Sequence, residues 1–127
     1  MPDLMIAAMP YAFWGIVYHL IADWLFQNES MATKKTNLRN SEAWWHGLVH
    51  FVMMVAIFPL PFAILIALLH VLIDERSFMN WWRKKYGQTT EGEMGVHVAI
   101  WTDQVAHIVI ICIISQLLAF MIQHGWA

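Results

Sequence analysis

The sequence contains few charged residues: Asp, Glu, Lys and Arg make up 13% of its 127 residues. Soluble globular domains typically contain about a quarter charged residues. The net charge is only −2, which argues against a strongly basic protein that binds nucleic acid through its phosphates. Because 60% of the residues are hydrophobic, a disordered chain is excluded as well.

Cysteine is almost absent, since Cys112 is the only one. An internal disulfide is therefore excluded, and Cys112 lies in an apolar run, where we interpret it as a small packed side chain rather than a catalytic thiol. The sequence also lacks a phosphate-binding glycine loop and the G-x-S-x-G motif of serine hydrolases. Nucleotide-dependent and serine-hydrolase chemistry are thus not indicated.

What the sequence has in abundance is long apolar runs, at residues 4–26, 43–73 and 104–127. Asp23 is the only Asp, Glu, Lys or Arg residue in these three runs. A helix needs about 20 predominantly apolar residues to cross a bilayer. The first and third runs therefore each supply one transmembrane helix.

Two prolines, Pro59 and Pro61, interrupt the middle run. Prolines at this spacing remove backbone donors and favour a turn between two helices. We therefore predict an all-α fold, an integral membrane four-helix bundle that forms a single domain over residues 1–127. The alternative is three transmembrane helices with a proline-kinked middle helix. The predicted helices cover about residues 4–27, 42–58, 61–82 and 96–124.

The positive charges favour the four-helix alternative. All seven Lys and Arg residues lie in two segments, 28–41 and 75–95. Four helices put both segments on one side of the membrane, whereas three helices would divide them. By the positive-inside rule, both segments of this multi-pass cell-membrane protein are then cytoplasmic and both termini are outside. Five tryptophans fall at the cytoplasmic helix ends, as an interfacial aromatic belt would: Trp24, Trp44, Trp45, Trp81 and Trp82.

Each predicted helix carries two polar side chains four residues apart. Residues at this spacing lie on one face of a helix, one turn apart. In the alternating topology all four pairs lie near the cytoplasmic face, so we expect them to meet at one level of the bundle. Ionisable side chains inside a membrane are costly and usually mark a functional site. The pairs are His19 and Asp23, His46 and His50, His70 and Asp74, and Asp103 and His107.

The chemistry of these pairs indicates a metal site. Histidine and aspartate together are typical ligands of zinc and other divalent first-row metals. We predict one or two divalent ions, with zinc favoured. Asp74 and Asp103 are the candidates for a catalytic base or a metal bridge. The candidate metal ligands are His19, Asp23, His50, His70, Asp74, Asp103 and His107.

Three further histidines lie outside this ligand set. His46 stands beside Trp44 and Trp45 near the interface, where an interfacial role is at least as well supported as a ligand role. We keep His46 as a neighbour of the metal site or of the substrate. His97 and His124 are expected to have no polar partner on the same helix face, and we expect neither to take part.

The order of these motifs resembles an uncharacterised domain-of-unknown-function family of small bacterial and phage membrane proteins with several helices. The H-x-x-x-D helices also look like those of membrane-bound metal-dependent hydrolases. The resemblance implies the same metal site, with Gln27, Gln104 and Lys34 as its polar neighbours, and implies no particular substrate. The motifs that carry it are HLIAD at 19–23, followed by Gln27 and the pair Lys34-Lys35, then HGLVH at 46–50, HVLID at 70–74 and DQVAH at 103–107.

Together these features suggest a membrane-embedded metal-dependent hydrolase whose substrate is a lipid or another amphiphile. Membrane lipid is the expected partner, nucleic acid is not, and association into a homo-oligomer is left open. Two other functions would use the same side chains. One is non-catalytic metal binding or metal and proton handling, and the other is bis-histidine haem ligation. The nearby aspartates favour a divalent cation over haem.

Overall fold

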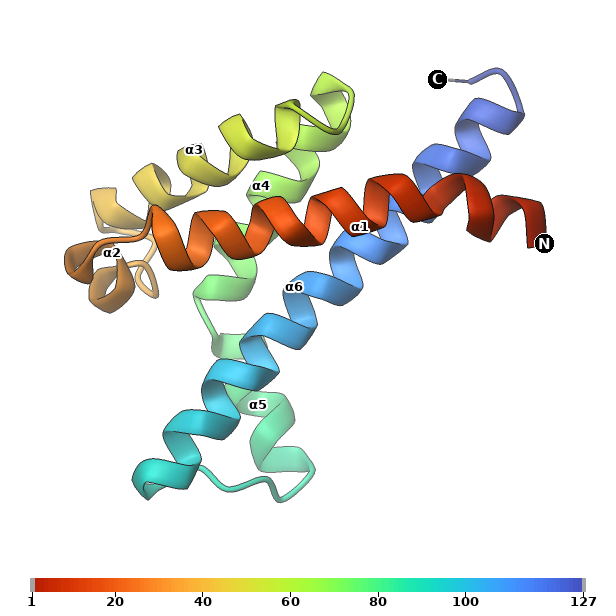
Figure 1. Cartoon of the computed structure of the whole chain (residues 1–127). Helices are drawn as coiled ribbons and strands as arrows, with labels where there is room; N and C mark the ends of the chain where they lie inside the picture. The colour runs from red at the N-terminus through yellow and green to blue at the C-terminus, as the bar shows by residue number, and fades with distance from the viewer. Residues whose placement is uncertain (1, 127) are drawn as a thin grey trace.

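The computed structural model describes residues 2–126, and over that range the chain forms six α-helices and no strand. The predicted all-α fold is confirmed. The predicted number of helices is not, because two short helices accompany four longer ones. The helices are α1 (Pro2–Leu25), α2 (Glu29–Lys34), α3 (Ser41–Val55), α4 (Leu60–Asp74), α5 (Ser77–Lys85) and α6 (Gly92–Gln123) (Figure 1).

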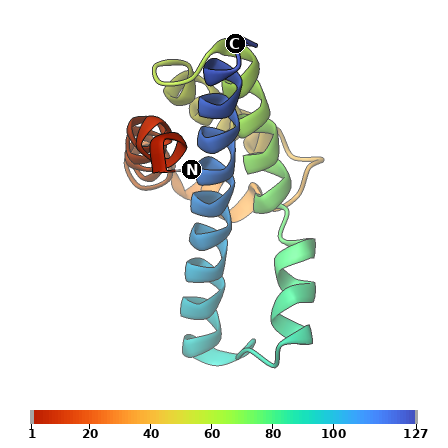
Figure 2. The same cartoon turned by 90° about the vertical axis from the view of Figure 1, so that its right-hand side faces the viewer.

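The four longer helices pack in the cyclic order α1, α3, α4, α6, and α6 closes the ring against α1. Helices α3 and α4 form a hairpin, whereas α1 crosses α6 obliquely (Figures 1 and 2). The N-terminal part of α6 extends beyond the other three long helices, and α5 runs beside it (Figure 2). The ring encloses one interior into which all four helices project side chains.

The prolines of the middle apolar run separate two helices. Helix α3 ends at Val55 and α4 begins at Leu60, with Pro59 at the N-cap position. A proline in the first turn of a helix loses no hydrogen bond, because the N–H groups there have no partner within the helix. Residues 41–74 therefore form two helices of 15 residues each rather than one kinked helix.

The predicted helix over residues 61–82 is wrong, because α4 ends at Asp74 and α5 begins at Ser77. Arg76 between them has a φ of 68°, in the left-handed region, which interrupts a right-handed helix. Glu75 accepts hydrogen bonds from the Ser77 hydroxyl and from the Ser77 backbone N–H. These bonds hold the pKa of the Glu75 carboxyl below its usual range and satisfy a donor at the start of α5.

Helix α2 was not predicted. Asn28 caps it, since its side-chain oxygen accepts a hydrogen bond from the Met31 backbone N–H at 2.8 Å. At its C-terminal end the side chain of Lys34 is 55% exposed, whereas Lys35 is only 4% exposed. The short helix therefore turns one of two adjacent lysines into the interior of the ring.

The apolar core occupies the half of the ring nearest the turn between α3 and α4. Close contact between these two helices depends on Gly47 of α3, because a Cβ there would lie only 2.4 Å from Cγ2 of Val71. A small residue lets two helix backbones approach, and it does so next to His46 and His70. The core cluster consists of Met54, Phe58, Phe62, Ala63, Ile66, Ile111, Ile114 and Leu118.

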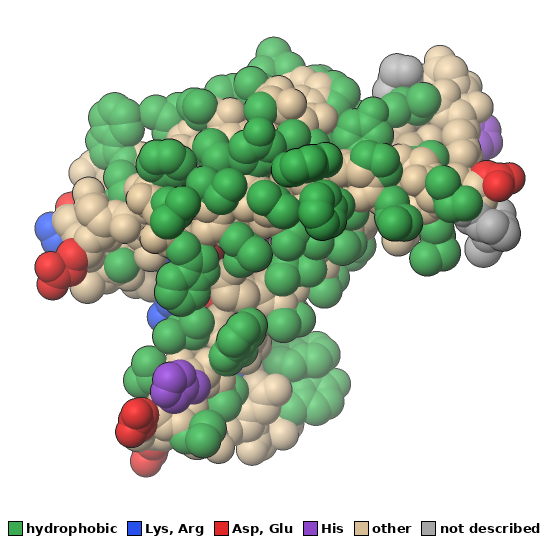
Figure 3. All heavy atoms as spheres, in the orientation of Figure 1, with side chains coloured by type: hydrophobic (Ala, Val, Ile, Leu, Met, Phe, Trp, Pro, Cys, Tyr) green, Lys and Arg blue, Asp and Glu red, His purple; other side chains and the backbone are tan. Residues whose placement is uncertain are grey.

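The outer surface of the long helices is also apolar. On α1, for example, Ile6, Met9 and Phe13 are each at least 60% exposed. Figure 3 shows apolar side chains spread over the face that α1 crosses, with the visible charged side chains near its edges. Helices α1 (over Asp3–Leu25) and α6 are long and apolar enough to cross a membrane.

Candidate metal centre

The polar pairs of the four long helices converge inside the ring. Together with one lysine of the chain following α2, they form a cluster of nine ionisable side chains, each at most 5% exposed. We call this group the polar cluster. Its members are His19, Asp23, Lys35, His46, His50, His70, Asp74, Asp103 and His107.

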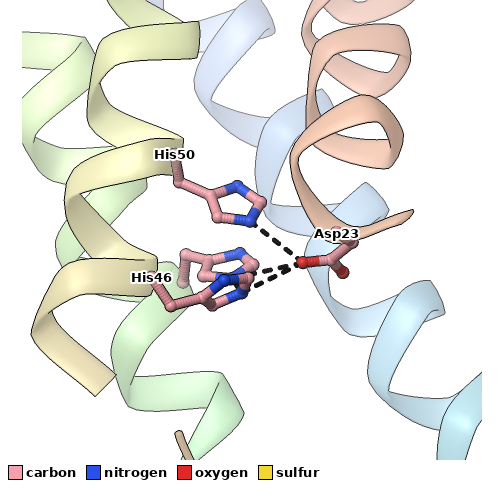
Figure 4. Close-up of side chains that lie close together, drawn as sticks. Asp23, His46 and His50 are labelled. Atoms are coloured by element: carbon pink, nitrogen blue, oxygen red, sulfur yellow. Dashed lines mark hydrogen bonds and ion pairs between the residues drawn. The ribbon is translucent and has the colours of Figure 1, made fainter. Parts of the chain in front are cut away.

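Asp23, near the end of α1, faces two histidines of α3 (Figure 4). Its Oδ1 accepts a hydrogen bond from His50 Nε2 at 2.9 Å and lies 3.1 Å from His46 Nε2. From α4, His70 Nε2 lies 3.0 Å from His46 Nε2 and 3.8 Å from Asp23 Oδ1. Four ligand atoms from three helices thus lie within 4.8 Å of one another.

The spacing of these four atoms suits a tetrahedral metal site. Zinc–nitrogen bonds are about 2.0–2.1 Å long, so two ligand atoms at a tetrahedral angle lie roughly 3.3 Å apart. Four of the six distances between these atoms, from 2.9 to 3.8 Å, lie on both sides of that value, and all six are within 4.8 Å. The set combines three imidazole nitrogens with one carboxylate oxygen, and such a set can hold a metal ion.

A second group of ligand atoms includes His70 as well. His70, Asp74 and His107 offer atoms that lie within 4.8 Å of one another. His107 Nδ1 lies 2.9 Å from the Asp103 carbonyl oxygen, and its Nε2 lies 3.4 Å from the His70 carbonyl oxygen. In the tautomer that donates from Nδ1, the Nε2 lone pair can bind a metal. Both carboxylate oxygens of Asp74 are buried: Oδ1 lies 3.1 Å from Lys35 Nζ, and Oδ2 lies 3.0 Å from His70 Nε2 and 3.3 Å from His46 Nε2. Both groups can hold an ion, and they adjoin each other at His70.

His19 and Gln104 contact the second carboxylate oxygen of Asp23, Oδ2. Gln104 Nε2 donates a hydrogen bond to Asp23 Oδ2 at 2.7 Å, and Gln104 Oε1 lies 3.2 Å from His19 Nε2. His19 Nε2 also lies 3.5 Å from Asp23 Oδ2. The predicted ligand His19 is therefore in the polar cluster but belongs to neither of the two ligand groups. His46, which the sequence left undecided, belongs to the first group.

Lys35 is the member of the polar cluster that the sequence analysis missed. Its Nζ lies 3.1 Å from Asp74 Oδ1, 3.3 Å from His46 Nε2 and 3.9 Å from Asp23 Oδ1. Lys34, the implied neighbour of the site, instead lies outside the cluster and pairs with Glu42 Oε1 at 3.0 Å. No sequence signal separates the two, because adjacent lysines differ only in the direction that a six-residue helix gives them.

A polar cavity of about 350 Å³ opens beside the polar cluster, between the end of α1, α2, α6 and Arg76. Gln27 and Asp103 line it. Their Oε1 and Oδ1 atoms, respectively, are buried without a hydrogen-bond partner among residues 2–126. The predicted residues Gln27 and Asp103 therefore line the cavity and belong to neither ligand group, although Asp103 Oδ2 lies 3.8 Å from His107 Nδ1.

The two histidines that we expected to take no part are exposed and belong to neither ligand group. The expectation that His97 has no polar partner on its helix face was wrong, because Glu93 Oε1 lies 4.0 Å from its Nε2. That pair is exposed, with His97 at 61% and Glu93 at 94%. His124 Nδ1 lies 2.8 Å from the Phe120 carbonyl oxygen at the end of α6. Both are suitable control positions.

Comparison with known proteins identifies the family. Residues 13–126 match the family described as Protein of unknown function (DUF3307), and the chain belongs to that family. The prediction of an uncharacterised family is thereby confirmed, and the matched range contains the whole polar cluster. No curated protein and no solved structure matches the chain.

Proposed function

We propose that this member of the DUF3307 family is a membrane-embedded metal-dependent hydrolase that acts on a lipid or another amphiphilic substrate. One observation carries the proposal: five histidines and three aspartates from four helices, each at most 5% exposed, meet in one cluster. Burying so many ionisable groups costs free energy unless they are paired or bind a metal. The family description names no activity, so the reaction is inferred from the site.

A membrane location is supported by the distribution of side chains, which is the opposite of that in a soluble protein. Large apolar side chains cover the outside of the long helices, whereas histidines and aspartates fill part of the interior. A soluble protein rarely exposes an apolar surface of this extent. Ionisable side chains that face the interior of a helical bundle are typical of functional membrane proteins.

For the topology, we propose that α1, α3, α4 and α6 cross the cell membrane and that both termini are outside. The start of α1 and the end of α6 lie on one side in Figure 1, away from α2 and the connection between α5 and α6. The Lys and Arg residues lie at 34–39, from the end of α2 into the α2–α3 connection, and at 76–85, from the α4–α5 connection to the end of α5. Such residues favour the cytoplasm. With 15 residues each, α3 and α4 are short for a span and require a locally thinner bilayer.

The proposed cofactor is a divalent ion, with zinc favoured by the His and Asp ligands. Asp23, His46, His50 and His70 would hold one ion, and Asp74 and His107 would help to hold a second where two ions bind. When bound, a divalent ion acts as a Lewis acid and makes a water molecule acidic near neutral pH. Its charge would also offset the aspartates in an interior of low dielectric constant.

Two members of the polar cluster are placed to move protons. Asp103 has a buried Oδ1 without a hydrogen-bond partner among the described residues, so it can accept a proton from a water molecule in the cavity. Lys35, which also lines the cavity, can donate a proton to the leaving group. Hydrolysis then places the hydroxyl of water on the acyl or phosphoryl centre and a proton on the departing oxygen, with no further reactant.

The proposal is tested with purified protein in lipid nanodiscs and a panel of phospholipids and other amphiphilic esters. We expect hydrolysis that a chelator abolishes and zinc restores. Asp103→Asn should remove the activity, and His97→Ala is the matched control because its side chain is exposed. Absence of hydrolysis by zinc-loaded protein across the panel would contradict the proposal, as would full activity of Asp103→Asn.

Two alternative functions fit the packing less well. Ion transport needs a polar path through the membrane, but on the far side of the polar cluster the interior is filled by apolar side chains such as Met54 and Leu118. Ser115 there donates its hydroxyl hydrogen to the Ile111 carbonyl. Haem needs room for a porphyrin between two imidazoles, whereas the rings of His50 and His70 stack with centroids 3.4 Å apart.

A further inference from the structure

We propose that the polar cavity binds the phosphate group of a substrate, so that the substrate of the proposed hydrolase is a phosphate ester. The inference rests on the proposed function for the reaction but on separate residues for the binding. Two cationic side chains, Lys35 after α2 and Arg76 between α4 and α5, line this cavity of about 350 Å³ beside the ligand groups.

Arg76 has a buried hydrogen-bond donor that the residues described by the structure leave unpaired. None of the ion pairs formed within residues 2–126 includes it. Its Nε is buried and has no hydrogen-bond partner in that same range. A buried donor without a partner is costly, and the guanidinium fork matches the oxygens of a phosphate group. An anionic group in the cavity would satisfy this donor.

The balance of charge around the cavity also favours an anion. The carboxylates of Asp23, Asp74 and Asp103 are opposed by two cations: Lys35, which is buried with them, and Arg76, which is half-buried and lines the cavity. A divalent ion in the ligand groups would leave one positive charge in excess. A phosphodiester carries one negative charge, so it would neutralise the site in a region of low dielectric constant, where an unpaired charge is expensive.

The wall of the cavity suits an amphiphile. Trp24 and Val96, which line it, are 65% and 59% exposed on the outer surface and would contact the apolar part of a lipid. Gln27 Oε1 is buried there without a partner among the described residues and can accept a hydrogen bond from a hydroxyl of the alcohol part. A lipid phosphodiester and a soluble one share the phosphate group, and the experiment separates them.

The binding test uses zinc-loaded protein in detergent and titration calorimetry with inorganic phosphate. Arg76→Gln should weaken phosphate binding roughly tenfold or more, as expected for a lost charge-assisted hydrogen bond, while zinc content stays unchanged. Arg39→Gln is the matched control, because Arg39 is an exposed cation on the same side of the protein. Equal phosphate affinity of Arg76→Gln and wild type would overturn the inference.

A second variant covers the case in which Arg76→Gln does not fold. Ile100 also lines the cavity, so Ile100→Trp should fill the space and abolish phosphate binding without changing any charge or the zinc content. Unchanged phosphate affinity in this variant would overturn the inference. So would acetate competing as strongly as phosphate, because the cavity would then be a carboxylate site.

The source of the phosphate group is decided by comparing dihexanoyl phosphatidylglycerol with bis(p-nitrophenyl) phosphate. If phosphatidylglycerol binds more strongly and its binding depends on Arg76, the substrate is a lipid. If bis(p-nitrophenyl) phosphate binds more strongly in the same way, the substrate is a soluble ester. Phosphate binding that depends on Arg76, without hydrolysis of either compound, would contradict the hydrolase and support the binding site. If the protein hydrolyses a carboxylic ester and Arg76→Gln leaves that rate unchanged, the result would support the hydrolase and contradict the phosphate-binding site.

Discussion

The ammonium nitrogen of Lys35 lies 3.1 Å from Oδ1 of Asp74, and these two side chains are 5% and 2% exposed. The pair joins the segment after α2 to the end of α4 and places the Lys35 ammonium group beside both ligand groups. When a buried ion pair loses one partner, the remaining charge is left uncompensated, at a cost of about 3–5 kcal/mol. Lys35 therefore holds the polar cluster together when no metal is bound.

We predict that Lys35→Met destabilises the metal-free protein by about 3 kcal/mol or more. Lys34→Met is the matched control and should cost about 0–1 kcal/mol, because its pair with Glu42 is exposed. Denaturant unfolding in detergent with a chelator measures both. Zinc should reduce the effect of Lys35→Met, because the ion supplies the missing positive charge next to Asp74. Similar losses in the two variants would show that the buried pair has no special role.

The two aspartates that the sequence selected as catalytic candidates should behave differently. Asp74 is in a ligand group, so Asp74→Asn should lower zinc content. Asp103 faces the cavity, so Asp103→Asn should keep zinc and lower the hydrolysis rate by about 10²–10⁴-fold, the usual contribution of a general base. Elemental analysis and activity are measured on the same samples. Loss of zinc from Asp103→Asn would place this carboxylate among the ligands instead.

Much of the site could be predicted because helical spacing is a local property. The pairs at i and i+4, such as His19 with Asp23 and His70 with Asp74, share a helix face whatever the tertiary structure is. A buried apolar environment then turns these faces towards one another. The turn at Pro59 was predictable for the same reason, since proline acts on its own turn of the chain.

The remaining features depend on contacts that the local sequence does not contain. The break at Arg76 rests on a left-handed residue that is not glycine, and such a conformation is rarely predicted from residue type. The choice of Lys35 over Lys34 depends on how α2 packs against α3. Gly47 lets α3 approach α4 closely, and His46 beside it lies 3.0 Å from His70 of α4, a consequence of tertiary packing.

Cysteine labelling tests the proposed topology. In a Cys112→Ser background, single cysteines replace Thr36, Thr90 and His124, which lie in or beside the connections and at the end of α6. We expect Thr36→Cys and Thr90→Cys to react only from the cytoplasmic side and His124→Cys only from outside, as the positive-inside rule requires. Labelling of Thr36→Cys and Thr90→Cys from opposite sides would contradict four membrane crossings.

Zinc affinity should fall as the pH falls. An imidazole must be deprotonated to bind a metal, so His46, His50 and His70 each bind zinc in competition with protons. We expect the affinity to fall progressively as the pH is lowered from about 8 to about 4. A chelator competition assay measures the dissociation constant at each pH. An affinity that does not change across this range would mean that the histidines are not ligands.

The most direct measurement of the central claim is the metal content of purified protein in matched detergent, for wild type and single alanine variants. We predict one or two zinc ions per chain in wild type, and a joint loss of zinc and stability on replacing His46, His50 or His107. The loss should be largest for His70→Ala, because His70 is in both ligand groups. His19→Ala should weaken zinc binding, because His19 contacts Gln104 and Gln104 in turn holds Asp23.

The control variants His97→Ala and His124→Ala should keep the wild-type zinc content, and their stability should stay within about 0.5 kcal/mol of wild type. Loss of zinc from either of these two, with His50→Ala and His70→Ala still fully loaded, would contradict a metal centre in the polar cluster.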